Sequence, residues 1–198
     1  MADRRHLGRR AALFLAAAVV ATIGLAAVPD PANAWAPGQF EPNAEAELFA
    51  LTNDARAAAG LPVLKNDLAL KKFARYRSKD MGDRDYFSHN IPPTGKMVFA
   101  VMTAGGYCYK WAGENIGWST YPDETATAQI QQMFMASATH RANILNGRWT
   151  NMGIGAYQAA DGKKLWTVLF SVPCGTSASI SSPPRPKMNG SPPFRRTT

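Results

Sequence analysis

Apolar residues in the first two-thirds of the chain recur every three or four positions, which is the period of an amphipathic helix. This spacing predicts a first helix over residues 42–59, which Gly60 and Pro62 terminate. A second helix follows, and either Asn66 or Asp67 can serve as its N-cap. The pattern therefore indicates helices separated by short polar turns.

Two further helices are predicted in the middle of the chain. Thr94 fits the N-cap of a helix whose apolar positions lie within 97–104 and which ends at Gly105. A fourth helix begins near Pro122 and buries apolar residues as far as Phe134. Acidic residues in its first turn suit the positive end of the helix dipole.

The last third of the chain has the composition of β-strands. Residues 152–157 and 165–172 are rich in branched and aromatic side chains, and Asp161-Gly162 between them is typical of a hairpin turn. A further short strand is predicted over 107–111. Helices followed by a compact antiparallel sheet predict an α+β domain in which the helices cover the sheet.

The first residues have the three parts of a secretory signal peptide. Arginines precede an apolar run, and the small-residue site Ala32-Asn33-Ala34 follows it. A membrane anchor is the alternative, because an apolar run of about 18 residues is at the lower limit for spanning a bilayer. The alanine-rich run and the small-residue site favour cleavage. We therefore assign 1–34 to a signal peptide and expect a secreted mature chain without a transmembrane segment. The export route, general or twin-arginine, stays open.

The rest of the chain is long enough for one domain with a hydrophobic core. We predict an N-terminal linker over 35–43, a single domain over 44–174 and a tail over 175–198, and we expect a monomer. The tail is rich in proline, serine and basic residues. Such a segment cannot bury enough apolar surface to offset the entropy of ordering, so it is expected to be disordered.

The net charge of +8 is concentrated at the two ends of the chain. The segment before Trp35 holds four arginines against two aspartates, and the tail holds four basic residues without an acidic one. A nucleic-acid-binding domain would concentrate positive charge on its folded surface, so specific nucleic-acid binding is not expected. The basic tail is either a plain solubilising segment or a contact for anionic wall polymer or membrane.

Cys108 and Cys174 are the only cysteines. Export makes a disulfide between them possible. It would close a span of about 66 residues, for which the chain-entropy model gives about 4 kcal/mol of stabilisation. Two separate thiols are the alternative, because spacing alone does not show that the two Cα atoms come within reach.

Three short polar segments hold the candidate chemistry. They are 88–90 with His89, 113–117 with Glu114 and Asn115, and 140–145, which begins with His140. After the signal peptide only these two histidines remain. Any site that uses an imidazole must therefore use one or both of them.

These segments belong to a series of six motifs that occur in the order seen in the secreted CAP superfamily. The motifs are Leu51-Thr52-Asn53-Asp54-Ala55-Arg56, Gly60-Leu61-Pro62-Val63-Leu64, Phe87-Ser88-His89, Gly113-Glu114-Asn115-Ile116, His140-Arg141-Ala142-Asn143-Ile144-Leu145 and Met152-Gly153-Ile154-Gly155. From about Ala44 to Val172 the chain resembles this superfamily of cysteine-rich secretory, antigen 5 and pathogenesis-related proteins, and most of all its bacterial branch. The resemblance implies an α-β-α sandwich with a surface cleft, which in some relatives binds a divalent metal.

Carried over by position, His89, Glu114 and His140 match the cleft residues of the superfamily, and Asn115 lies beside them. Ser137 stands where many eukaryotic relatives have a second glutamate. Two imidazoles and a carboxylate suit Zn²⁺ or another divalent cation, with water in the remaining position. The missing carboxylate should weaken metal affinity. Hydrogen-bonded structural roles are the alternative for each residue.

From these features we expect a secreted binding protein whose cleft holds a divalent ion, another small molecule, a lipid or a wall-polymer fragment. One competing hypothesis is a metal-dependent extracellular hydrolase with His89, Glu114 and His140 as ligands. Against it, the chain has no H-E-x-x-H motif and no evident separate general base, so we favour a protein that is not an enzyme and assign no catalytic residue. A second competing hypothesis is a structural or partner-binding factor with a vestigial cleft. Methionines could line a lipid groove, although core filling is favoured.

Overall fold

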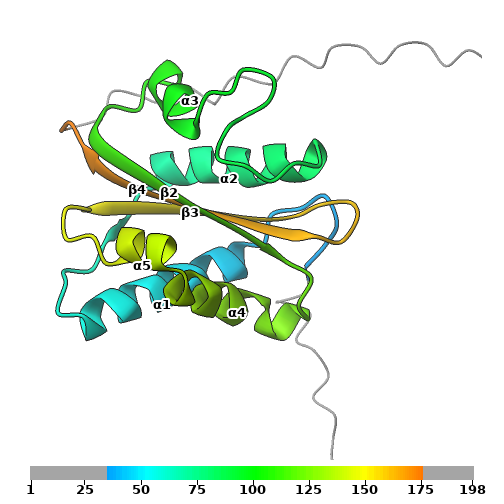
Figure 1. Ribbon diagram of the computed structural model, residues 1–198, viewed down its shortest axis with the longest axis horizontal. Helices are drawn as coiled ribbons and strands as arrows, with labels where there is room; N and C mark the ends of the chain where they lie inside the picture. Colours follow the sequence, from blue (N-terminus) through cyan, green and yellow to red (C-terminus); the bar gives the residue numbers. More distant parts are fainter. Residues whose placement is uncertain (1–34, 176–198) are drawn as a thin grey trace, which may run out of the picture.

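The computed structural model describes residues 35–175, and within them five helices and four strands form (Figure 1). In chain order these are α1 (Pro42–Ala58), β1 (Lys65–Asn66), α2 (Leu68–Asp83), α3 (Val98–Ala104), β2 (Tyr109–Ser119), α4 (Asp123–Ala136), α5 (Ala138–Ile144), β3 (Asn151–Gln158) and β4 (Lys164–Pro173). The predicted signal peptide, and the predicted tail apart from Gly175, lie outside the described residues. Between residues 35 and 175 no helix has the length and apolarity needed to cross a membrane.

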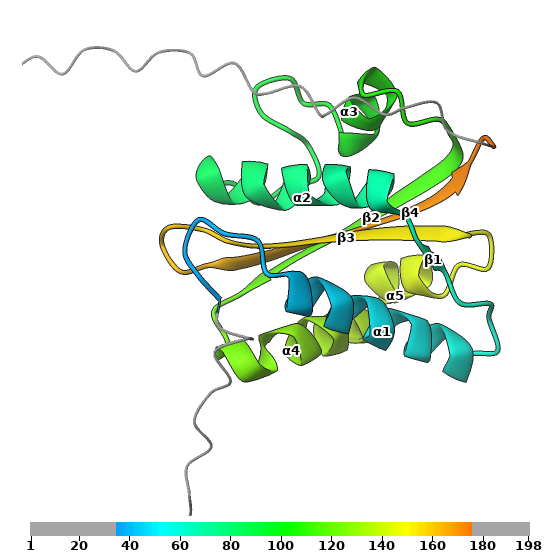
Figure 2. The same cartoon turned by 180° about the vertical axis from the view of Figure 1, so that it is seen from behind.

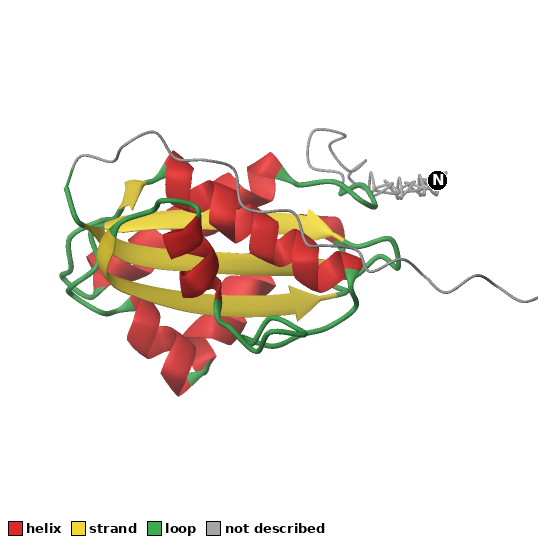
Figure 3. Cartoon of the chain, turned by 90° about the horizontal axis from the view of Figure 1, so that it is seen from above, coloured by secondary structure: helices red, strands yellow, loops and turns green. Residues whose placement is uncertain are grey.

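The strands form one sheet between two layers of helices. The strand order is β1-β3-β4-β2, in which β2 and β3 both run antiparallel to β4. Helices α2 and α3 cover one face, and α1, α4 and α5 cover the other (Figures 1 and 2). Figure 3 looks onto the sheet and shows its long strands side by side between the helices. The predicted α+β class and α-β-α sandwich are confirmed. The sheet is not purely antiparallel, because the two-residue β1 pairs in parallel with β3.

Helix α2 packs backbone to backbone against β3, and two glycines make this possible. A Cβ atom at Gly153 would lie 2.4 Å from the backbone nitrogen of Lys71, and one at Gly155 would lie 2.4 Å from that of Arg75. Both distances are far inside van der Waals contact, so any larger residue would push the helix away from the sheet. This close packing fixes the height of α2 above the sheet and with it the position of Arg77.

The predicted helix starts are partly confirmed. Asp67 caps α2, since its Oδ1 accepts hydrogen bonds at 3.0 Å from the backbone nitrogens of both Ala69 and Leu70. The prediction that Thr94 caps the third helix is wrong. Its hydroxyl donates to the Ile91 carbonyl within a turn, and α3 begins only at Val98. Threonine forms such local turns as readily as helix caps, so the sequence alone did not separate the two.

The observed bounds of β2 and of the helices after it differ from the sequence prediction, and the difference determines where the site residues lie. The strand predicted over 107–111 continues to Ser119, so Glu114 and Asn115 lie in the middle of β2. The fourth helix ends at Ala136 and an extended residue follows it, so His140 lies on the separate short helix α5. Glycines within β2 lower its strand propensity, which is why the periodicity did not reveal its full length.

The segment 35–43, which the sequence marks as a linker, belongs to the folded domain. The Trp35 side chain is buried, and its ring meets that of Trp166 edge-on with the centroids 4.9 Å apart. Phe40 forms a bridge with Tyr157 on β3, and Pro42 already begins α1. Apolar residues in a short, non-periodic segment gave no sign of this packing.

Cys108 and Cys174 form a disulfide, with their Cα atoms 5.4 Å apart. The bond joins the residue before β2 to the residue after β4, beside a backbone hydrogen bond from the Cys174 nitrogen to the Cys108 carbonyl. The predicted pairing is therefore confirmed, and the alternative of two free thiols is wrong.

Candidate functional site

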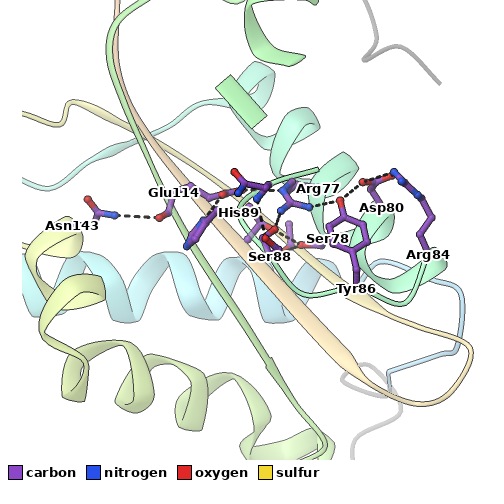
Figure 4. Close-up of polar contacts among 12 residues, drawn as sticks. Arg77, Ser78, Asp80, Arg84, Tyr86, Ser88, His89, Glu114 and Asn143 are labelled. Atoms are coloured by element: carbon purple, nitrogen blue, oxygen red, sulfur yellow. Dashed lines mark hydrogen bonds and ion pairs between the residues drawn. The ribbon is translucent and has the colours of Figure 1, made fainter. Parts of the chain in front are cut away.

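The predicted polar site is built around the carboxylate of Glu114 on β2. Its side chain is 1% exposed, and each of its two oxygens has a cationic or imidazole partner. Arg77 Nε donates to Oε1 at 3.2 Å, and His89 Nδ1 donates to Oε2 at 2.6 Å (Figure 4). The arginine comes from α2, and the histidine comes from the loop after that helix. Together they neutralise and satisfy a carboxylate that would otherwise be buried alone.

Arg77 also fixes the loop that carries His89. Its side chain is fully buried, and its two terminal nitrogens donate to the Tyr86 hydroxyl at 2.7 Å and to the Ser88 carbonyl. The Tyr86 hydroxyl in turn donates to Asp80, and burial together with this carboxylate raises the pKa of the phenol. One guanidinium therefore joins α2, β2 and the loop, and it holds His89 against Glu114 (Figure 4). The sequence analysis did not identify Arg77, because nothing in a single helix pattern separates it from neighbouring solvated arginines.

Asn115 attaches α5 to the same strand. Its side-chain amide donates to the His140 carbonyl at 3.0 Å, and its carbonyl oxygen accepts from Asn143 at 2.9 Å. Asn143 also donates to the Glu114 backbone carbonyl at 3.1 Å. Asn115 is fully buried, and its amide holds α5 and the backbone of His140 against β2.

His140 lies close to His89 but is not bonded to Glu114. Its ring packs on Phe134 with the centroids 5.0 Å apart. Burial lowers the pKa of His140, and its electrostatic interaction with His89 lowers it further, so the neutral imidazole is favoured near pH 7. The structure thus brings His89 and Glu114 into direct contact and leaves His140 as a separate wall of the site.

In the part of the chain that the structure describes, no three His, Cys, Asp or Glu side chains are placed to hold one metal ion. The reason is visible at Glu114, since both of its oxygens are already bonded to Arg77 and His89. The carboxylate orients His89 in the manner of the carboxylates that lie behind metal-bound imidazoles.

A largely apolar groove of about 670 Å³ opens on the other side of His140. It runs from this histidine and Ser137 along the second half of β2 to the loop before α4. Its walls come from Phe87, Ile116, Gly117, Trp118, Ser119, Thr120, Tyr121, Pro122, Ile130, Met133 and Phe134. Among these, the side chains of Phe87, Trp118, Tyr121 and Met133 are large, apolar and exposed. The volume is in the range of small-molecule sites.

Ser119 contributes to the groove wall at the end of β2, and its hydroxyl oxygen is buried beneath that wall. The residue is buried, and its hydroxyl oxygen has no hydrogen-bond partner among the described residues. Buried hydroxyl groups are nearly always bonded, so an ordered water molecule is the expected partner of this one. No motif in the sequence pointed to Ser119.

Comparison with known proteins matches the fold and these motifs to one family. The family model described as "CAP: Cysteine-rich secretory protein family" matches residues 49–170, which is more than half of the chain. The chain belongs to the CAP family. Within that match lie all the polar residues of the site, from Arg77 to Asn143. The predicted resemblance is thereby confirmed.

Two relatives of this CAP domain come from bacteria. The chain is 40% identical over 126 residues to YkwD of Bacillus subtilis, a protein named as uncharacterised, and the match covers 64% of this chain and 46% of that protein. A solved extracellular protein of Bacillus anthracis that contains an SCP domain is 32% identical, with a TM-score of 0.58, over 66% of this chain and 40% of that one. The chain therefore spans less than half the length of these relatives.

A third comparison shows the fold alone. An outer surface protein of Borrelia burgdorferi superimposes with a TM-score of 0.61 at 15% identity, over 69% of this chain and 98% of that one. The same layered fold is thus formed by a sequence with few identical residues.

Proposed function

We propose that this chain is a secreted CAP-domain protein that binds a small amphipathic, lipid-like molecule in the groove beside His140. The observation that carries the proposal is the groove itself, which is about 670 Å³ in volume and walled mostly by apolar side chains. Water in such a groove contacts few polar atoms, so its displacement by an apolar ligand favours binding. The signal-peptide pattern and the extracellular relative support secretion.

Polar groups at two points of the groove supply orientation. His140 stands at one end, and its lowered pKa leaves a neutral ring that can both donate and accept a hydrogen bond. The unpaired hydroxyl of Ser119 is buried just beneath the wall formed by the end of β2, so a small side-chain rotation would be needed for it to reach a ligand. A molecule with an apolar body and polar atoms matched to these groups would satisfy both and fill the space between them.

The geometry favours binding over hydrolysis. General-base hydrolysis uses a carboxylate or imidazole that is free and is also oriented to take a proton from water. Glu114 has both oxygens engaged by Arg77 and His89, and it does not line the groove. The imidazole of His140 is not bonded to any orienting carboxylate that the structure describes. These contacts support a site that recognises a molecule and does not transform it.

A divalent cation is the second candidate occupant, favoured by one observation. His89 donates its Nδ1 hydrogen to a buried carboxylate, which leaves Nε2 as a metal-binding atom on a half-exposed ring. His140 is held neutral, the form that a metal requires. Two imidazoles with water as the remaining ligands would bind Zn²⁺ more weakly than a three-ligand protein site.

A fluorescence titration tests the proposed lipid-like ligand. Purified protein is titrated with dansyl-undecanoic acid, and binding should be saturable at one site. Met133→Lys places a charge on the groove wall and should weaken binding at least tenfold. The matched control is Met97→Lys, because Met97 is another partly exposed methionine but lies outside the groove. Unsaturable binding, or equal loss in the two variants, would contradict the proposal.

Calorimetry with Zn²⁺ alone separates the second candidate from the first. Wild-type protein should bind one ion if the imidazole pair is the site, and a His89→Ala, His140→Ala double variant should bind none. Met133→Lys should still bind the ion, since it leaves both imidazoles in place. Heat that survives in the double variant, or no heat in the wild type, removes the cation site and leaves the groove proposal intact.

A further inference from the structure

The structure places the backbone nitrogen of Trp35, the residue that follows the predicted cleavage site, against a carboxylate. This nitrogen donates to Asp123 Oδ2 at 3.2 Å. The Trp35 side chain is buried, and its edge-on contact with Trp166 on β4 holds the nitrogen in place. A residue expected at the very start of the mature chain is therefore anchored as firmly as a core residue.

Asp123 belongs to a small charged cluster that joins three parts of the fold. It is the first residue of α4, and its Oδ1 accepts from Lys164 Nζ on β4 at 2.8 Å. The same ammonium donates to the Tyr121 carbonyl at 2.7 Å and lies 5.8 Å from the centre of the Trp35 ring. Asp123 and Lys164 are the charged groups that face the Trp35 nitrogen in the described contacts.

We propose that cleavage between Ala34 and Trp35 creates an α-ammonium that forms an ion pair with Asp123 and so completes the fold. The small-residue site Ala32-Asn33-Ala34 ends at this peptide bond. Hydrolysis by a signal peptidase breaks the amide C–N bond and consumes one water. Ala34 leaves as a carboxylate, and the Trp35 nitrogen becomes an ammonium. Before cleavage the nitrogen is a neutral amide donor to Asp123, and after cleavage it is a charged one.

The added charge strengthens an existing contact and needs no rearrangement. The bond is already charge-assisted through the Asp123 carboxylate, and an ammonium donor adds the attraction between opposite charges. Two factors moderate the gain, because the Asp123 side chain is about one-third exposed and already shared with Lys164. The Trp35–Asp123 contact ties the N-terminal segment to the start of α4. Lys164, which is bonded to Asp123, also donates to the Tyr121 carbonyl and so includes the preceding loop. This inference concerns maturation of the domain and does not depend on what occupies the groove.

N-terminal sequencing tests the first half of the proposal. The full chain is expressed with its own leader in an exporting bacterium, and the secreted protein is sequenced from its N-terminus. The sequence Trp35-Ala36-Pro37 is expected. A different start, or retention of the leader in the folded protein, would overturn the proposal.

A mutant cycle tests the ion pair itself. The mature chain, 35–198, contains every element of the described fold, and it is compared with the same chain extended by N-acetyl-Ala34, which keeps the Trp35 N–H as a neutral amide and leaves no α-ammonium. Both are made with Asp123 and with Asp123→Asn. Cleavage should raise the melting temperature by about 2 °C when Asp123 is present and by less than half as much in the Asn variant. An equal effect in both backgrounds would reflect the extension alone and would overturn the ion pair.

Discussion

Removing the guanidinium of Arg77 should destabilise the domain severely, because it leaves a buried carboxylate behind. In wild type the Arg77 and Glu114 side chains are 0% and 1% exposed. An Arg77→Met variant keeps much of the apolar packing but removes the hydrogen bonds to Glu114, Tyr86 and Ser88. Breaking a buried ion pair on one side costs about 3–5 kcal/mol. For a domain of this size that corresponds to a loss of about 10–15 °C in melting temperature.

The assay is urea unfolding followed by tryptophan fluorescence, with two further variants. Arg75→Met is the matched control on the same helix, because Arg75 is part-exposed and its partner Glu45 keeps Lys71 at 2.7 Å. It should cost about 1 kcal/mol. Adding Glu114→Gln to Arg77→Met should recover a large part of the loss, because no charge is then buried. If Arg77→Met were no worse than Arg75→Met, or the second change gave no recovery, the reasoning would be refuted.

Three other perturbations have outcomes that follow from the structure. Replacing Cys108 and Cys174 by serine should lower the free energy of unfolding by about 4 kcal/mol, measured in urea, because the bond closes a long loop; a loss below about 1 kcal/mol would be inconsistent with this. His140 has a lowered pKa, so the unfolded state binds more protons just below pH 6.5 and stability should fall as the pH drops through that region. His140→Asn, measured with chelator present, should flatten this part of the pH curve, and an unchanged slope would count against the assignment. Gly153→Ala should cost about 3 kcal/mol or more, because its Cβ would meet the backbone of α2 at 2.4 Å. Gly147→Ala, whose nearest neighbour would be 3.7 Å away, should be nearly neutral in the same thermal melt.

The sequence predicted the layered fold well because its helices have strong periodicity and clear end signals. Asp67 is an example, since a capping residue beside a regular apolar stripe leaves few alternatives. The strand β1 was not predicted because two residues cannot show alternation. Trp35 was assigned to a linker because its burial depends on Trp166, far away in sequence. Local patterns therefore revealed elements, while contacts between distant segments had to come from the structure.

The candidate site shows the same division between residue choice and residue role. Motif order pointed to His89, Glu114 and His140, and the structure places the two histidines near each other with Glu114 bonded to one of them. The motif order did not reveal that Arg77 is hydrogen-bonded to the Glu114 carboxylate, because that contact joins two separate elements. Nor did it reveal the groove with Ser119, whose walls combine a strand edge, a loop and a helix.

Photo-crosslinking tests the central claim, that the groove beside His140 binds a lipid-like molecule, most directly. Purified protein is irradiated with a diazirine-bearing fatty acid, and the labelled peptides are mapped by mass spectrometry. Label is expected within 116–122 and 130–140, the two segments that form most of the groove. Excess unlabelled fatty acid and the Met133→Lys change should both abolish it. Label spread over the surface, or concentrated on other segments and insensitive to competition, would contradict the account.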